Sequence, residues 1–295
     1  MIPPRRVLAA VDFSDASRVA LTLAARLAQH CRAELHVLHA GDPLLSAAAR
    51  HQGIDLSNET RKELEAFVAA AQPAPDCRPH LHAIIGPAVD AISDAAVDHA
   101  VDVIVVGSRG MSGATRLMFG STTEGLLRSA DRSILVVPDE WVPPQPDAPD
   151  LRGTGPVLAA VDFSDESIAA VAVAHEFARV LQASLEVVHV VPERLVPSRW
   201  QPYADAAVSE RRESAQRDLT TLTEPLGQSV PVRLRVETGS VSQTLADITA
   251  PAPWRQPILV LGRRPPGVKG KAPGAIAYRV LMLAQVPVLV HVPEG

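Results

Sequence analysis

Glycine and hydroxyl residues recur at a spacing that could hold an anion. Gly107 and Gly110 are followed by Gly120, Ser121 and Thr122, in the pattern G-x2-G-x9-G-S. Glycines let a backbone turn sharply and approach a ligand closely. A helix that begins after Gly120 would offer free N–H groups and a positive dipole end, which suit a phosphate. The pattern predicts a phosphate cradle without the lysine of a P-loop, although glycines that merely turn the chain would also explain the spacing.

Two arginines within this segment and two residues from other strand ends could also contact a ligand. Arg109 and Arg116 lie within it and could screen the charge of a phosphate. Asp12 follows the first apolar strand directly, and Ala40 closes the second. In an open parallel sheet, ligands bind beyond the carboxyl ends of the strands. We therefore expect Asp12 and Ala40 to lie near the glycine-rich loop.

Strands and helices alternate along the first half and must position these residues. Ser14 or Asp15 can cap a helix after the first strand, and further helices are expected near 58–71, 87–99 and 121–129. Apolar segments predict strands at Val7–Val11, Glu34–His39, Pro79–Ile85, Val103–Val106 and Ser133–Val137. Continuous apolar strands separated by helices indicate a parallel sheet that is covered on both faces. We expect an α/β fold, with one doubly wound five-stranded parallel sheet in each half of the chain.

The chain contains an internal repeat. The segment VLAAVDFSD occupies residues 7–15 and again residues 157–165, identical at all nine positions. Weaker matches continue, and their offset drifts from 150 to 155 as loop insertions would cause. A proline-rich segment between the halves predicts a stiff linker. The predicted organisation is a first domain at 1–140, a linker at 141–155 and a second domain at 156–295.

Composition excludes several functional classes. The 28 Lys and Arg against 33 Asp and Glu give a net charge of −5, which argues against binding nucleic acid through its phosphate backbone. No uninterrupted apolar run approaches about 18 residues, so we expect no membrane span. Cys31 and Cys77 form no disulfide framework, and a reducing cytoplasm is the simplest setting.

The motifs together resemble the universal stress protein family in its tandem two-domain form. VDFS after the first strand, the HA ending of the second and G-x2-G-x9-G-[ST] carry the resemblance, which spans nearly the whole chain. It implies a Rossmann-like, adenine nucleotide alpha hydrolase-like fold that binds an adenine nucleotide, usually ATP, in the first half. By position it implies that Asp12 and Ala40 meet the adenosine, and that the ribose and phosphates are lined by Val106, Gly107, Gly110, Gly120, Ser121 and Thr122.

The second half departs from this pattern. Pro265 stands where the first half has Gly110, and counting on places Ala275 at Gly120 and Ile276 at Ser121. An alignment shifted to Gly274 would still lack the hydroxyl. We expect the second half to bind ATP weakly or not at all and to have a structural or regulatory role. Its cations could still hold another anion: Arg263, Arg264, Lys269 and Lys271.

Three functions remain open. The first is a cytoplasmic, ATP-binding regulator of the stress response with an unidentified protein partner, in which the halves pair next to their fifth strands and the chain could pair again as a homodimer. The second is a slow ATPase or self-phosphorylating protein, with Ser121 or Thr122 as acceptor and Ser121 as a ligand to Mg²⁺. The third is a scaffold without nucleotide.

Other polar residues are expected to have structural roles. His39 and His189 end matching strands without the companions that a metal needs, and we expect them at the rim of a site. His80 and His82 share one face of a strand, where a solvated face is a simpler reading than a two-ligand metal clip. In 205–224, acidic and basic residues alternate, which predicts a solvated surface helix.

Overall fold

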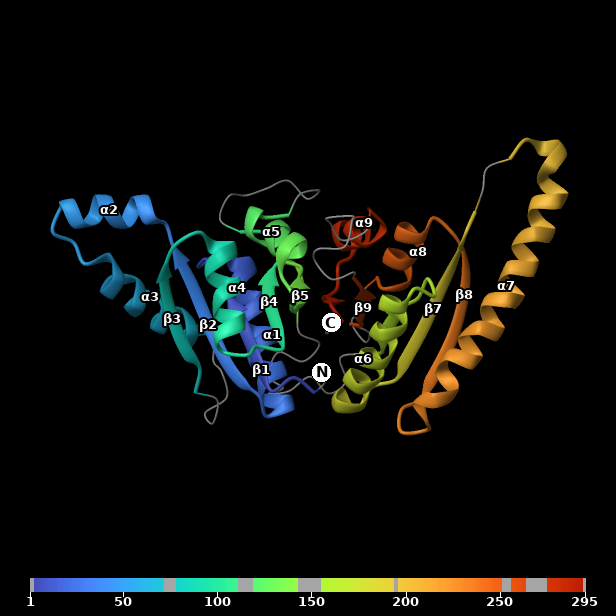
Figure 1. Cartoon of the computed structure of the whole chain (residues 1–295), viewed down its shortest axis with the longest axis horizontal. Coiled ribbons are helices and arrows are strands. Elements are labelled where there is room, and N and C mark those ends of the chain that lie inside the picture. Colours follow the sequence, from blue (N-terminus) through green and yellow to red (C-terminus); the bar gives the residue numbers. More distant parts are fainter. Residues whose placement is uncertain are drawn as a thin grey trace. The chain divides into compact units, whose positions relative to one another are not determined.

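The chain forms two compact units that follow one another along the sequence. The computed structural model describes residues 3–71, 78–110, 119–142, 155–193, 196–250, 256–263 and 275–293. Of these, residues up to 142 belong to the first unit and residues from 155 onward to the second (Figure 1). Most of the predicted linker, with Pro143, Pro144, Pro146 and Pro149, lies outside the described residues, whereas Trp141 at its start is buried.

The first unit alternates strands and helices as its sequence predicts. Its elements are β1 (Arg6–Ala10), α1 (Asp15–Cys31), β2 (Glu34–Gly41), α2 (Pro43–His51), α3 (Leu56–Ala70), β3 (His80–Ile85), α4 (Ala88–Asp98), β4 (Val103–Gly107), α5 (Ser121–Ser129) and β5 (Ser133–Val137). The strands lie in the order β3-β2-β1-β4-β5, and every pair is parallel. The order reverses direction at β1, so the switch point lies between β1 and β4.

The second unit repeats this arrangement. Its elements are β6 (Val157–Ala160), α6 (Asp165–Leu181), β7 (Leu185–Pro192), η1 (Ser198–Trp200), α7 (Gln201–Thr223), η2 (Glu224–Leu226), β8 (Val232–Gly239), α8 (Val241–Ile248), β9 (Ile258–Gly262), α9 (Ala275–Leu283) and β10 (Val288–His291). The order β8-β7-β6-β9-β10 is again parallel throughout. The predicted α/β fold with two doubly wound parallel sheets is confirmed.

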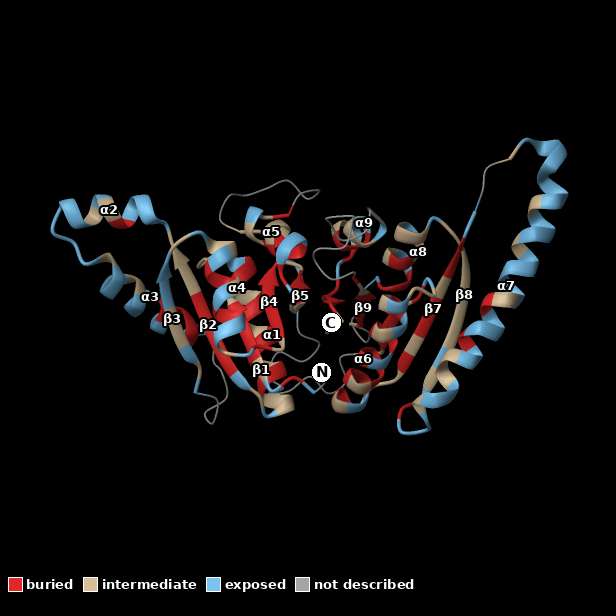
Figure 2. Ribbon diagram, in the orientation of Figure 1, coloured by how far each residue is buried: buried red, intermediate tan, exposed pale blue. Residues whose placement is uncertain are grey.

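Helices cover both faces of each sheet. In the first unit α1 and α3 share a face, where the guanidinium of Arg18 lies 4.4 Å from the ring centre of Phe67. On the other face α4 contacts α5, as right-handed crossovers in this strand order require. The central strands are therefore buried, and all five residues of β4 are classed as buried in Figure 2.

One helix of the first unit differs from the sequence prediction, and the predicted third strand is partly exposed. Helix α2 was not expected; it begins after Asp42, whose carboxylate accepts the N–H of Leu44 at 2.7 Å, with Pro43 in its first turn. That helix has only nine residues and is largely exposed, so its segment is too short for an apolar period to be recognised. Strand β3 lies at one end of the strand order and leaves Ile84 and Ile85 exposed.

The long charged segment of the second half is a surface helix, as predicted. Helix α7 buries only Ala215 and Leu219 and is exposed along most of its length in Figure 2. None of the described helices is long and apolar enough to cross a membrane.

Both units begin their first helix with the same serine cap. The hydroxyl of Ser14 accepts the N–H of Ser17 at 3.1 Å, and Ser164 accepts that of Ser167 at 3.4 Å. Ser14→Ala removes this acceptor, together with the hydrogen bond that the hydroxyl donates to Asp12, and should lower the free energy of unfolding by about 1 kcal/mol or more. Urea titration checks the value, and Ser129→Ala is the control because its exposed hydroxyl caps nothing. An equal loss in both variants would contradict the role assigned to the cap.

Candidate functional site

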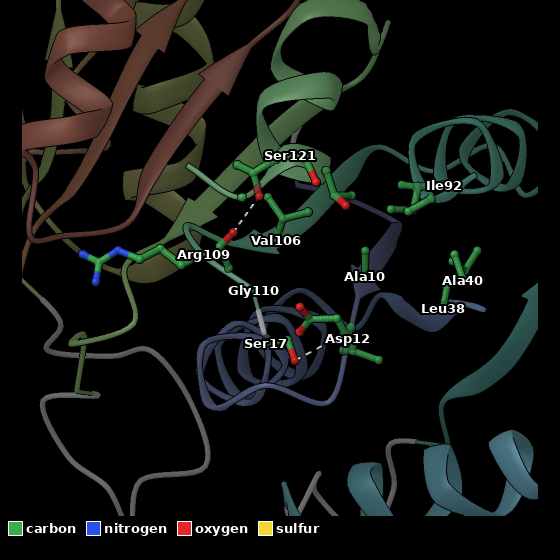
Figure 3. A pocket seen from close by; sticks show the side chains of 16 residues that line it. Ala10, Asp12, Ser17, Leu38, Ala40, Ile92, Val106, Arg109, Gly110 and Ser121 are labelled. Carbon is green, nitrogen blue, oxygen red and sulfur yellow. Dashed lines mark hydrogen bonds between the residues drawn. The ribbon is translucent and has the colours of Figure 1, made fainter. Parts of the chain in front are cut away.

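A cavity of about 250 Å³ opens at the carboxyl ends of β1, β2 and β4 in the first unit (Figure 3). Its volume lies just below the range of about 300–1,000 Å³ that is typical of small-molecule sites. The structure brings together nine residues that the sequence placed at the site: Asp12, Ala40, Val106, Gly107, Arg109, Gly110, Gly120, Ser121 and Thr122. Arg116 lies outside the described residues.

Other lining residues were missed by the sequence analysis: Ala10, Val11, Ser17, Leu38, Ala88, Ile92 and Thr123. A signal for some of them was present. Leu38 lies two residues before Ala40 on β2, and alternate residues of a strand share a face. Ala88 and Ile92 are four residues apart on α4 and so share a helix face. Ser17 gave no such signal, because its place depends on how the chain leaves β1.

A tight turn after β1 fixes the carboxylate of Asp12. Phe13 has a φ of 64°, a left-handed conformation that is uncommon for a bulky residue. This turn lets Asp12 Oδ1 accept the backbone N–H of Ser14 at 3.1 Å and its hydroxyl at 2.5 Å. Ser17 Oγ accepts the backbone N–H of Asp12 at 3.4 Å. The orientation of the Asp12 carboxylate is therefore fixed by hydrogen bonds from Ser14 at the start of α1.

The glycine-rich loop approaches this carboxylate closely. A Cβ atom on Gly110 would lie nearer to Asp12 Oδ2 than Cβ atoms approach other atoms in real proteins. Only glycine therefore fits between the loop and Asp12 without displacement. The spacing of the glycines thus reflects a close approach and not merely a turn of the chain.

Helix α5 begins at the cavity without a side-chain cap. Its N-cap is Gly120, which has no side chain that could accept an N–H of the first turn. The N–H of Gly120 donates to Ser108 O at 3.1 Å, and Thr123 Oγ1 donates to Gly107 O at 2.7 Å. These bonds fix the helix start against the end of β4. The first turn then presents Ser121 and Thr122 to the cavity, with the positive end of the helix dipole.

The charge of Arg109 is paired within the protein and does not face the cavity as the sequence predicted. Its guanidinium pairs with the Asp139 carboxylate at 2.9 Å, and Figure 3 shows the side chain extending away from the other lining residues. Screening of a phosphate by Arg109 therefore requires this ion pair to break.

The cavity has one apolar and one polar side. In Figure 3 Leu38, Ala40 and Ile92 lie together at one side, whereas Asp12 and Ser121 lie toward the glycine-rich loop. An apolar wall suits a flat aromatic ring, and a helix start suits an anion. The arrangement matches a ligand that joins a heterocycle to a charged group.

The strand-end histidines are held by backbone carbonyl groups. His39 Nδ1 lies 2.9 Å from Val11 O, and its ring stacks on Phe13 with centroids 4.3 Å apart. His189 Nδ1 lies 2.8 Å from Val161 O in the second unit. A carbonyl only accepts, so Nδ1 of each ring carries the hydrogen. Neither ring lines the cavity of the first unit, and both support the turn after the first strand.

Both domains match one family of known proteins. A sequence model of the universal stress protein family matches residues 3–138 and 154–293. The chain belongs to the universal stress protein family. It is 27% identical over 309 aligned residues to universal stress protein Rv2623 of Mycobacterium tuberculosis, covering 96% of this chain and 95% of that protein.

Two further relatives extend this comparison. Universal stress protein YxiE of Bacillus subtilis is 31% identical over 144 residues, which are 45% of this chain and 97% of that protein. A universal stress protein of Archaeoglobus fulgidus has a crystal structure that covers 98% of this chain and 99% of its own, with 18% identity and a TM-score of 0.65. The first relative corresponds to one domain, and the second shares the two-domain fold.

The second domain of this universal stress protein keeps the turn after its first strand. Phe163 has a φ of 63°, and Asp162 Oδ1 accepts the hydroxyl of Ser164 at 2.5 Å. Burial raises the pKa of Asp162, but hydrogen bonds from Ser164 and Ser167 outweigh burial and hold that pKa below its usual value. The conserved turn is therefore a property of the repeat and not of the cavity alone.

The strand register changes the alignment of the two domains after the glycine-rich loop by one residue from the alignment that counting along the sequence gives. In the sheets Gly107 pairs with Val137, and Gly262 pairs with His291. The difference in residue number between matching positions of the two domains is therefore 155 before the loop, at Gly107 and Gly262, and 154 after it, at Val137 and His291. Helices α5 and α9 begin at Ser121 and Ala275, which agrees with this smaller offset. Ala275 therefore stands at Ser121, not at Gly120. Outside the described residues lie Arg264, Pro265, Lys269, Lys271 and Gly274.

Cys31 is poorly suited to metal or redox chemistry. Burial raises the pKa of its thiol to about 12. The thiolate is the reactive and metal-binding form, so Cys31 is inert near neutral pH. Cys77 lies outside the described residues.

Proposed function

We propose that the first domain binds an adenine nucleotide, with ATP and Mg²⁺ as the leading candidate, and that this ligand regulates the protein in the stress response. The observation that carries the proposal is the uncapped start of α5, which opens onto the same cavity as Asp12 and Ala40. Its N–H groups and dipole suit phosphates, while Leu38, Ala40 and Ile92 offer an apolar surface for the base.

The residues of the cavity also fit a bound Mg²⁺. The hydroxyl groups of Ser121 and Thr122 are oxygen ligands of the kind that Mg²⁺ accepts beside phosphates. Mg²⁺ would neutralise phosphate charge that Arg109, paired with Asp139, does not reach.

Binding is favoured over hydrolysis. Among the described lining residues Asp12 is the only carboxylate, and its Oδ1 is already engaged by Ser14. A regulatory ligand needs only to bind one conformation of the protein more tightly than another. The pairing of the two domains next to their fifth strands, a homodimer, a protein partner and a cytoplasmic location stay predictions.

Titration calorimetry with ATP and Mg²⁺ on the full chain tests the proposal. We expect one site per chain, because the second domain has Ala275 where the first has Ser121. ATP at a hundredfold excess over Kd should also raise the free energy of unfolding by about 2.7 kcal/mol. Two sites would contradict the assignment to the first domain alone, and no heat would favour the scaffold hypothesis. Released ADP or an added phosphate mass after incubation would instead support the enzyme hypothesis.

A further inference from the structure

Four histidines gather at the end of the first sheet that lies opposite the cavity. His36 is the third residue of β2, His80 and His82 lie on β3, and His99 directly follows α4. In the register of β2 and β3, His36 pairs with His80, and His82 lies two residues further on the same face. The cluster thus lies nearer the amino ends of the strands than the cavity does; His82 pairs with Leu38, which lines the cavity, but no residue belongs to both.

Three of these rings present nitrogen atoms to one another. One ligand atom from each of His36, His82 and His99 lies within 4.8 Å of the other two. His36 Nδ1 lies 3.0 Å from His82 Nε2. Ring centroids are 4.9 Å apart for His36 and His99, and 4.6 Å apart for His82 and His99. In the described part of the chain, this is the one group of three or more such residues with the proximity that a metal ion needs.

The central ring is buried with part of its hydrogen-bonding capacity unused. His36 is only 6% exposed, and its Nε2 has no hydrogen-bond partner among the described residues. Buried polar atoms nearly always have a partner, so an exception requires an explanation. The Glu34 carboxylate lies 3.9 Å from this nitrogen, beyond hydrogen-bond distance.

In the second domain the positions equivalent to His36 and His82 hold two side chains that pair with each other. Leu8 pairs with His36 and the repeat's Leu158 pairs with Glu186, so Glu186 occupies the position of His36. Glu186 forms an ion pair with Arg235 at 3.3 Å, and Arg235 occupies the position of His82. The second domain therefore fills these positions with opposite charges, whereas the first fills them with imidazoles.

We propose that His36, His82 and His99 form a binding site for a divalent transition metal ion, with Zn²⁺ as the ion that the ligand set fits best. Imidazole suits Zn²⁺, which three histidines can hold while a fourth position stays open. With Zn–N bonds of about 2.0–2.1 Å, two ligands on a tetrahedral ion lie about 3.4 Å apart. The 3.0 Å between His36 Nδ1 and His82 Nε2 is already close to this value.

Metal binding through Nδ1 also explains the unused nitrogen of His36. The other nitrogen, Nε2, would then carry a hydrogen and donate toward the Glu34 carboxylate. Metal-bound histidines typically donate their second N–H to a carboxylate or carbonyl in this way. Glu34 is more than half exposed, and its Oε2 already accepts from Arg6 Nε at 3.1 Å, so it would approach His36 by a shift of this surface ion pair. The exposed ring of His80 stacks on His36 with centroids 5.0 Å apart and lies beside the site.

Calorimetric titration of Zn²⁺ into the metal-free full chain, without nucleotide, tests the site. We expect one Zn²⁺ per chain, and binding at least tenfold weaker in both His82→Gln and His99→Gln. The control is His51→Gln, an exposed histidine at the end of α2, which should bind as the wild type does. Thermal unfolding of each variant without metal checks that it folds.

Co²⁺ gives a second measurement on the unmodified chain. A site of three imidazoles should produce the visible absorption of tetrahedral Co²⁺ at one equivalent, and Zn²⁺ should abolish it. Absence of this spectrum, or Zn²⁺ binding that is equal in all variants, would overturn the proposal. Neither outcome bears on nucleotide binding, because the cluster and the cavity share no residue.

Discussion

Gly110→Ala is expected to weaken ATP binding at least tenfold, a loss of about 1.4 kcal/mol or more. The new methyl group would collide with Asp12 Oδ2. The carboxylate cannot turn aside freely, because Oδ1 is held by the N–H and hydroxyl of Ser14. Either Asp12 moves or the loop withdraws, and both reshape the cavity. Titration calorimetry on the full chain measures the loss.

Two controls separate this clash from a general effect of adding a methyl group. A Cβ atom on Gly86 would meet nothing within 4 Å, so Gly86→Ala should bind ATP as the wild type does. In an Asp12→Ala background the colliding oxygen is absent, and Gly110→Ala should then cost little more. Contacting residues of this kind are not additive. An equal additional loss in both backgrounds would show that the clash with Asp12 is not the cause.

Gly262→Ala is expected to destabilise the second domain by about 3 kcal/mol, at the upper end of the range for overpacking. Its Cβ would lie 2.5 Å from the carbonyl carbon of Glu166 and 2.7 Å from Ser167 N, and closer still to Glu166 O. These are backbone atoms at the start of α6, so relief requires the helix and β9 to separate. Hydrogen exchange should therefore become faster in β9 and α6.

The matched control is Gly107→Ala in the first domain. There the nearest atoms, Ala16 C and O, lie at 3.1 Å, so we expect a loss of only about 1 kcal/mol. Gly262→Ala should also leave ATP binding unchanged if the nucleotide occupies the first domain alone. Equal destabilisation by the two substitutions would contradict the difference in packing that the structure shows.

Much of the fold could be predicted because its signals are local. The alternation of apolar strands and amphipathic helices depends on residues that are close in sequence, and the exact repeat of VLAAVDFSD revealed two copies. The predicted strand at Ser133–Val137 and the helix at 121–129 have the bounds observed. Helix α2 was missed because its nine residues contain too few apolar positions to establish a period.

The candidate site was predictable where one short motif supplies several lining residues. Gly107, Gly110 and Gly120 identified the loop because glycine spacing is itself the signal. The partner of Arg109 was not predictable, because Asp139 lies beyond β5 and approaches only when that strand pairs with β4. The place of Ala275 required strand register, because a loop that differs in length cannot be aligned by counting.

By itself, the sequence determined the tandem α/β architecture and nine of the residues that line the cavity, because periodicity and motif spacing depend on residues that are close in sequence. Only the tertiary structure decided which distant residues meet. His80 and His82 were visible as a pair, but His36 and His99 join them through the pairing of β2 with β3 and the end of α4. Such a cluster forms when strands far apart in sequence become neighbours, a contact that local spacing does not encode.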